Sequence, residues 1–214
     1  MEYRRNLPHF DHIGATFFVT FCLRNSLPVA VALRLKQERD KGLREAEEAA
    51  TPDLQKQQKY QIQNRYFQKI EHLLEHATFG DRFLNEPACT QILKDVMHEY
   101  DGKYYNLLAF CIMPNHVHLL IDTSAQLPPG EQDFNLEEYQ YIKDIMRRIK
   151  GKSGLLLNRE RNTSGEIWFK ESFDRYIRND RHLRYTLNYI LDNPVKAKLA
   201  QQWTDWSGTY LKPS

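Results

Sequence analysis

Short apolar runs along the chain predict four β-strands. The run Ala15–Leu23 follows Gly14 and is rich in β-branched and aromatic residues, which is typical of a strand. Two more runs, Tyr105–Met113 and His116–Asp122, are separated by Pro114-Asn115, so they are expected to pair as an antiparallel hairpin. A fourth strand is predicted within Ile167–Ile177.

A long charged region between the first two strands predicts a helical hairpin. Residues 30–50 and 53–76 are dense in Glu, Lys, Arg, Gln and Ala, and Thr51-Pro52 separates them. Because their apolar stripes are thin, we expect this hairpin to project from the domain as an accessory element. Its deletion is therefore expected to leave a folded core.

Apolar residues at helical spacing predict three further helices. Their ranges are Pro87–Tyr100, Phe134 to about Gly151, and Asp180–Asn193. The last is expected to stop before Pro194, because a helix usually ends at the residue that precedes a proline.

The order of these elements predicts an α+β fold, with a ferredoxin-like antiparallel sheet and helices on one face. An inserted helical hairpin at about residues 30–80 and a C-terminal helix complete the prediction. The length of 214 residues suits a single domain over residues 1–214 that carries this insertion.

Composition indicates a folded protein without a membrane span. The N-terminal residues Met1–Arg5 lack the apolar core of a secretory signal, so we expect a cytoplasmic protein. Cys22, Cys89 and Cys111 are odd in number, have no CxxC spacing and lie in apolar patterns, so buried free thiols are expected.

Positive charge is concentrated in the C-terminal half. The formal net charge is only +2, but residues 141–198 contain fourteen Lys and Arg against seven Asp and Glu, a net charge of +7. Such asymmetry is expected when one face meets a polyanion, although chance clustering of surface cations also produces it.

His116 and His118 are candidate metal ligands. In a strand, residues two apart point to the same face of the sheet, so the two imidazoles can converge on one ion. The alternative is a pair of hydrogen-bonded histidines on a half-exposed strand. The apolar residues on both sides favour a buried strand, in which polar rings need a partner.

The last helix carries a second polar group. Leu183, Leu187, Ile190 and Leu191 are predicted to form its core stripe, with His182, Tyr185, Tyr189 and Asn193 on nearly the opposite side. Tyr189 and Asn193 are one i, i+4 step apart. The plain alternative is an amphipathic surface row.

Several motifs together resemble the HUH single-tyrosine transposases, and within them the subgroup associated with repetitive extragenic palindromes (REP). They are Met113-Pro114-Asn115-His116-Val117-His118-Leu119-Leu120, residues 167–175 (IWFKESFDR), residues 188–196 (NYILDNPVK) and, near the N-terminus, residues 4–10 (RRNLPHF). The resemblance covers most of the chain outside residues 34–80, since the charged hairpin is absent from the minimal family pattern.

The resemblance implies an enzyme that cleaves and joins single-stranded or hairpin DNA at palindromic repeats. Tyr189 would be the nucleophile, with Tyr185 as second choice, and His116, His118 and Asn193 would bind Mg²⁺ or Mn²⁺. The products would be a 5′-phosphotyrosine and a free 3′-OH. General ligand preferences suit Mn²⁺ or Zn²⁺ better than Mg²⁺ when two imidazoles bind.

DNA is the expected partner, and the basic residues near the motifs are its candidate contacts. These are Arg4, Arg5, Arg147, Arg148, Lys150, Lys152, Arg175, Arg178, Lys196 and Lys198. Alternatives are a replication initiator or relaxase, a domesticated hairpin-binding protein without cleavage, and a ferredoxin-like RNA-binding or metallohydrolase domain. A monomer and a homodimer are equally compatible with the sequence.

Overall fold

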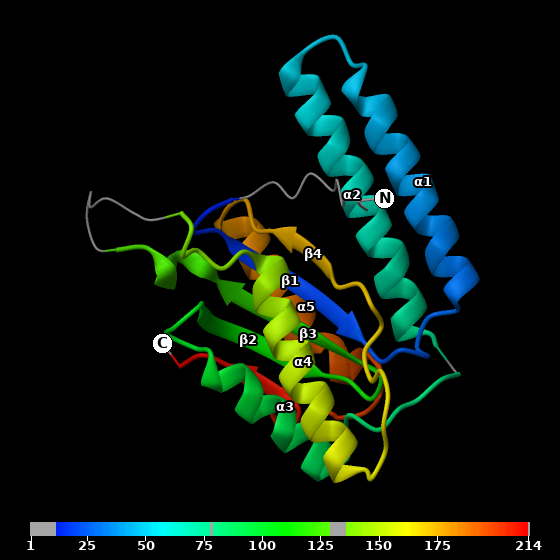
Figure 1. The fold of residues 1–214 in the computed structure, drawn as a ribbon, viewed down its shortest axis with the longest axis vertical. Coiled ribbons are helices and arrows are strands. Elements are labelled where there is room, and N and C mark those ends of the chain that lie inside the picture. Colours follow the sequence, from blue (N-terminus) through cyan, green and yellow to red (C-terminus); the bar gives the residue numbers. More distant parts are fainter. Residues whose placement is uncertain (1–11, 78, 129–135, 214) are drawn as a thin grey trace.

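A computed structural model describes residues 12–77, 79–128 and 136–213 of the chain. It forms a sheet with helices on both faces and a helical hairpin that rises from one edge (Figure 1). The strands are β1 Thr16–Cys22, β2 Asn106–Ile112, β3 His116–Asp122, β4 Phe173–Tyr176 and β5 Thr209–Leu211. The helices are α1 Val29–Glu47, α2 Pro52–Glu75, α3 Pro87–Glu99, α4 Ile142–Glu160 and α5 Asp180–Lys196, with short 3₁₀ turns at Thr123–Gln126 and Trp203–Asp205.

The sheet has the order β4-β1-β3-β2-β5, and every neighbouring pair is antiparallel. β3 lies between β1 and β2, with α3 before β2 and α4 after β3 in the chain. This is the split β-α-β arrangement of ferredoxin-like folds. The predicted α+β class and antiparallel sheet are therefore confirmed.

One face of the sheet packs against α3 and α4. The inward residues of the three central strands, among them Phe21, Val117 and Ile121, form one core with Leu93 of α3 and Ile149 of α4. Alternation along β3 sends Val117, Leu119 and Ile121 to this face, as predicted, and leaves His116 and His118 on the other.

The opposite face packs against α5 and the C-terminal half of α2. Phe67, Ile70 and Leu74 of α2 are buried there with Phe18 of β1 and Ile190 of α5. The helical hairpin was predicted, but its expected role as a mere projection is wrong for this half of α2. Three buried side chains at helical spacing are enough to anchor it to the sheet.

Two other elements have bounds that differ from the prediction, and one short strand was not predicted. The helix expected from Phe134 begins at Ile142 and extends to Glu160, and Leu136 is exposed. Of the strand expected over residues 167–177, only Phe173–Tyr176 is continuous, and Trp168 contributes an isolated bridge to Leu23. The short strand β5 was not predicted, because three residues carry too little pattern.

Helix α5 continues through Pro194 to Lys196, so the expected stop at Asn193 is wrong. A proline in the last turn removes one backbone N–H, and the helix continues for only two residues beyond it. The backbone N–H of Ala197 bonds to the carbonyl oxygen of Asn193, which closes the turn.

The cysteines match the prediction, since Cys22, Cys89 and Cys111 are buried free thiols. Among the described residues, no helix is long and apolar enough to cross a membrane.

Candidate functional site

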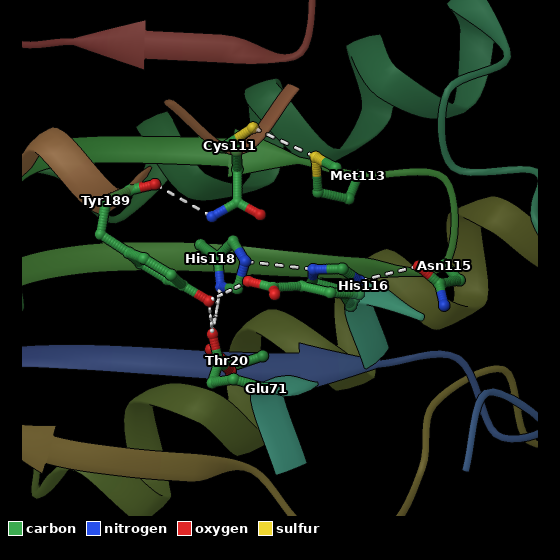
Figure 2. A network of polar contacts seen from close by, with 10 residues as sticks. Thr20, Glu71, Cys111, Met113, Asn115, His116, His118 and Tyr189 are labelled. Carbon is green, nitrogen blue, oxygen red and sulfur yellow. Dashed lines mark hydrogen bonds and ion pairs between the residues drawn. The ribbon is translucent and has the colours of Figure 1, made fainter. Parts of the chain in front are cut away.

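His116 and His118 lie at the centre of the sheet, on the face that α2 and α5 cover. Their exposed fractions are 1% and 0%, and their Nε2 atoms are 3.1 Å apart. Figure 2 shows the two rings facing each other between Asn115 and Thr20. The convergence predicted from the spacing of two along the strand is therefore present.

Each imidazole has a side-chain oxygen within hydrogen-bond distance of its Nδ1 atom. Nδ1 of His116 lies 2.7 Å from Oδ1 of Asn115, whose Nδ2 donates to the carbonyl of Leu74. Nδ1 of His118 lies 3.0 Å from Oγ1 of Thr20, which itself bonds to the Glu71 carboxyl. With the proton on Nδ1 of each ring, both Nε2 lone pairs point toward the same place.

Burial keeps both rings neutral. It lowers the pKa of His118 to about 4, and it lowers the pKa of His116 well below the ordinary value, with the neighbouring His118 contributing. Two lone pairs that face each other at 3.1 Å repel unless a cation lies between them. Ligands at right angles around an ion, with metal–nitrogen distances of about 2.1 Å, are about 3 Å apart.

Tyr189 lies on the sheet side of α5, beside the histidines. Its ring centroid is 5.5 Å from that of His118 and 5.8 Å from that of Phe18. The predicted position opposite the core stripe is therefore wrong, because the buried residues of α5 are Thr186, Ile190, Asn193 and Pro194. The helix faces a polar part of the sheet, so its inward side is polar too.

The hydroxyl of Tyr189 contacts two carboxylates of α2. It lies 2.6 Å from Oε2 of Glu71 and 2.6 Å from Oε1 of Glu75. Burial and these two glutamates raise the pKa of Tyr189, and burial raises the pKa of Glu71 to about 7. The hairpin thus contributes side chains to the site, although the sequence predicted that it is an accessory element.

Asn193 lies one turn after Tyr189 and is 2% exposed. Its Nδ2 donates to the carbonyl oxygen of Tyr189 at 3.0 Å. A hydrogen bond with the Asn193 amide also raises the pKa of His118, against the larger effect of burial. The role of Asn193 as a third metal ligand stays a prediction. Tyr185, the alternative nucleophile, is 65% exposed on the outer side of the helix.

The candidate donor set at this place is two imidazoles and one amide. Within residues 12–77, 79–128 and 136–213, no group of three or more His, Cys, Asp and Glu side chains could hold a metal ion. Two neutral nitrogens with an amide oxygen suit an open site whose remaining ligands come from water and substrate.

Four of the candidate DNA contacts lie on, or at the edge of, the face of the sheet that carries the site. The guanidinium of Arg175 lies over the rings of Phe18 and Phe67, and the Nζ of Lys196 is 5.3 Å from the Tyr189 ring centroid. Arg178 lies over Tyr60 of α2, and Lys198 is exposed just after α5.

The other described candidates do not gather there. Arg147, Arg148, Lys150 and Lys152 belong to α4, on the opposite face of the sheet. Lys150 is tied to the carbonyl oxygens of Phe169 and Lys170, and burial lowers its pKa to about 8, so its role is internal. The candidate DNA contacts were expected to lie together beside the site, and this expectation is wrong for the four residues of α4. Arg4 and Arg5 lie outside the described residues.

Sequence reasoning missed Thr20, Glu71 and Glu75. Thr20 has a weak signal, since it is the one polar residue within Phe17–Leu23 and shares its face with Phe18 and Cys22. The glutamates have none, because their contacts with Tyr189 span 118 and 114 residues.

Comparisons with known proteins agree with the motifs. No family model matches the chain. A provisionally named REP-associated tyrosine transposase of Haemophilus influenzae is 30% identical over 124 residues, covering 53% of this chain and 68% of that protein. The REP-associated tyrosine transposase of Escherichia coli K12 is 26% identical over 102 residues, covering 48% and 52%.

A solved structure of a REP-associated tyrosine transposase bound to a REP hairpin aligns with a TM-score of 0.45 and 20% identity. The alignment covers 98% of this chain and 81% of that chain. The identity and coverage of the Haemophilus relative establish the relationship at the level of sequence. The chain belongs to the family of REP-associated tyrosine transposases.

Proposed function

We propose that this protein cleaves and rejoins single-stranded or hairpin DNA through a covalent bond between Tyr189 and the 5′-phosphate of the cut strand. The observation that carries the proposal is the position of the Tyr189 ring, 5.5 Å from the ring of His118, in a site that also contains Asn193. A phosphotyrosine keeps the energy of the cleaved phosphodiester, so rejoining needs no nucleotide cofactor.

His116, His118 and Asn193 would hold a divalent ion in this function, with Mn²⁺ or Mg²⁺ as the expected metal. When bound, the ion polarises the scissile phosphate and stabilises the negative charge that develops on its oxygens. Nδ1 of each ring would donate its proton in a hydrogen bond to a side-chain oxygen, of Asn115 or of Thr20, which would leave both Nε2 atoms as ligands.

The DNA strand would approach from the side of α5 and the C-terminal half of α2. Lys196 and Arg175 are the cations placed next to Tyr189, and each offers a charge to the backbone phosphates that flank the cut. Unpaired DNA suits this site, because the attack requires a phosphodiester that is accessible beside a half-buried tyrosine.

Position-specific labelling tests the proposal. Hairpin DNA with a single-stranded flank is labelled at the 3′ end or at the 5′ end, incubated with protein and Mn²⁺, and separated by denaturing electrophoresis. The 3′ label is expected to move with the protein, and the 5′ label to appear in a shorter free strand. A binding-only role predicts retention under native conditions and no adduct with either label.

A further inference from the structure

Helix α2 brings two glutamates into the site from the inserted hairpin. Glu71 and Glu75 are four residues apart, so their carboxylates lie on one face of the helix, and both reach the Tyr189 hydroxyl at 2.6 Å. Figure 2 shows the Tyr189 ring directing its hydroxyl to Glu71, next to Thr20. The hydroxyl is therefore held by side chains outside the four motifs.

The two glutamates differ in their surroundings. Glu71 is 6% exposed, bonds to Thr20 and lies 3.5 Å from Nδ1 of His118, so its position is fixed on several sides. Glu75 is exposed and one turn nearer the end of α2. A phenol has one hydrogen to donate, and of these two carboxylates Glu75 is the one that can pass a proton on to water.

We propose that Glu75 is the base that accepts the Tyr189 proton during cleavage and that Glu71 positions the hydroxyl for attack. The inference rests on the proposed function. It assigns to the hairpin a direct part in the chemistry, since Glu75 touches the reacting oxygen itself. A phenol has an ordinary pKa of about 10, so at neutral pH its proton must be removed as the bond to phosphorus forms.

The step balances in atoms and charge. The bond between Tyr189 Oη and phosphorus forms, the bond between phosphorus and the 3′ oxygen breaks, and the hydroxyl proton moves to the Glu75 carboxylate. The leaving 3′ oxygen takes the electron pair of the broken bond and one proton from water, and Glu75 returns its proton to water. Rejoining runs through the same steps in reverse.

Single-turnover adduct formation on a labelled DNA hairpin tests this assignment. Glu75→Gln is expected to form the adduct about 100-fold more slowly than wild type, the lower end of what a general base contributes. Binding of the hairpin, measured by fluorescence anisotropy, should stay within about twofold. Glu45→Gln on α1, an exposed glutamate of the same hairpin, is the matched control and should leave both unchanged.

A second measurement separates proton transfer from a structural role. Wild type and Glu75→Gln are each made with 3,5-difluorotyrosine at position 189, whose more acidic hydroxyl depends less on a base. The rate ratio between the two proteins should then shrink at least several-fold, whereas a structural role of Glu75 leaves it unchanged.

The outcomes are distinguishable. A wild-type rate of adduct formation in Glu75→Gln and in the Glu71→Gln/Glu75→Gln double variant overturns the inference while the proposed function stands. An unchanged ratio with difluorotyrosine overturns the role of Glu75 as base. Absence of any adduct in wild type overturns the proposed function and this inference with it.

Discussion

The Nε2 atoms of His116 and His118 face each other at 3.1 Å, while Nδ1 of each ring contacts a side-chain oxygen. In the proposed function, this arrangement is the site for a divalent cation. The sequence alone could place the two side chains only on the same strand face. The polar environment on the Nδ1 side matters as much as the pair itself, because it orients both lone pairs.

Metal binding should depend on this pair. Titration of the protein with Mn²⁺, followed by calorimetry, is expected to give one site in wild type and none in His116→Ala. His98→Ala is the control, because His98 lies on α3 and packs edge-on against Tyr210 on the other side of the sheet. Chelation should stop DNA cleavage reversibly. Full cleavage by His116→Ala in the presence of chelator would show that no ion at this pair takes part.

The C-terminal half of α2 should contribute to the stability of the fold, whereas its N-terminal end should tolerate substitutions. Ile70→Ala removes a side chain that is 0% exposed between α2 and the sheet, and is expected to cost about 2–5 kcal/mol of unfolding free energy. Leu54→Ala, at the outer end of the same helix and 40% exposed, is expected to cost under about 0.5 kcal/mol.

Urea denaturation of the two variants measures the difference, and equal costs would contradict the division of α2 into an anchored and a free half. For the same reason, deletion of residues 30–76 is expected to expose the apolar residues that α2 covers on the sheet, among them Phe18 and Ile190. The deletion is therefore expected to abolish cooperative unfolding. The sequence alone predicted the opposite result.

Stability of the metal-free protein should respond to pH in opposite directions at His118 and Glu71. Folding lowers the pKa of His118 to about 4, so on acidification His118 is protonated in the unfolded chain before it is protonated in the folded one. A fall in pH from 6.5 to 4 therefore destabilises the fold. Folding raises the pKa of Glu71 to about 7, so falling pH from 7 to 4.5 stabilises the fold.

Between pH 7 and 5 each group contributes about 2 kcal/mol, since one unit of pKa shift corresponds to about 1.4 kcal/mol. Glu71→Gln should therefore steepen the loss of stability on acidification, and His118→Gln should reduce it. Denaturation with chelator present at pH 7, 6 and 5 gives the slopes. Parallel slopes in wild type and both variants would exclude these titrations.

DNA affinity should depend on cations beside the site and not on those of α4. Lys196→Ala is expected to weaken hairpin binding and to lower the slope of log K against log salt concentration by about one. Arg147→Ala on α4 is the matched control and should change neither quantity, because its exposed side chain lies over the other face of the sheet. Equal losses in the two variants would place DNA on both faces.

Strand positions in the central sheet could be predicted because their pattern is local. The run His116–Asp122 coincides with β3, and the Pro114-Asn115 turn correctly predicted its pairing with β2. The histidine pair followed from the same alternation. Motif resemblance added Tyr189 and Asn193, which periodicity alone had placed on the surface.

The rest depended on contacts between distant residues. The side chain of Tyr189 turns inward because Thr20, His118 and Glu71 offer it a polar surface, whereas the apolar-stripe rule assumes an apolar one. Lys150 shows the reverse case, since a lysine expected at DNA is held by backbone carbonyls of residues 169 and 170. Neither environment can be predicted from the residues that are adjacent in the sequence.

Identification of the residue that carries DNA tests the central claim most directly. Wild type, Tyr185→Phe and Tyr189→Phe are incubated with hairpin DNA and Mn²⁺, digested with nuclease and protease, and analysed by mass spectrometry for a peptide with a nucleotide on tyrosine. The nucleotide is expected on Tyr189 in wild type and in Tyr185→Phe, with no modified peptide in Tyr189→Phe although its hairpin affinity is kept. A modified peptide in Tyr189→Phe that disappears in Tyr185→Phe would contradict the account.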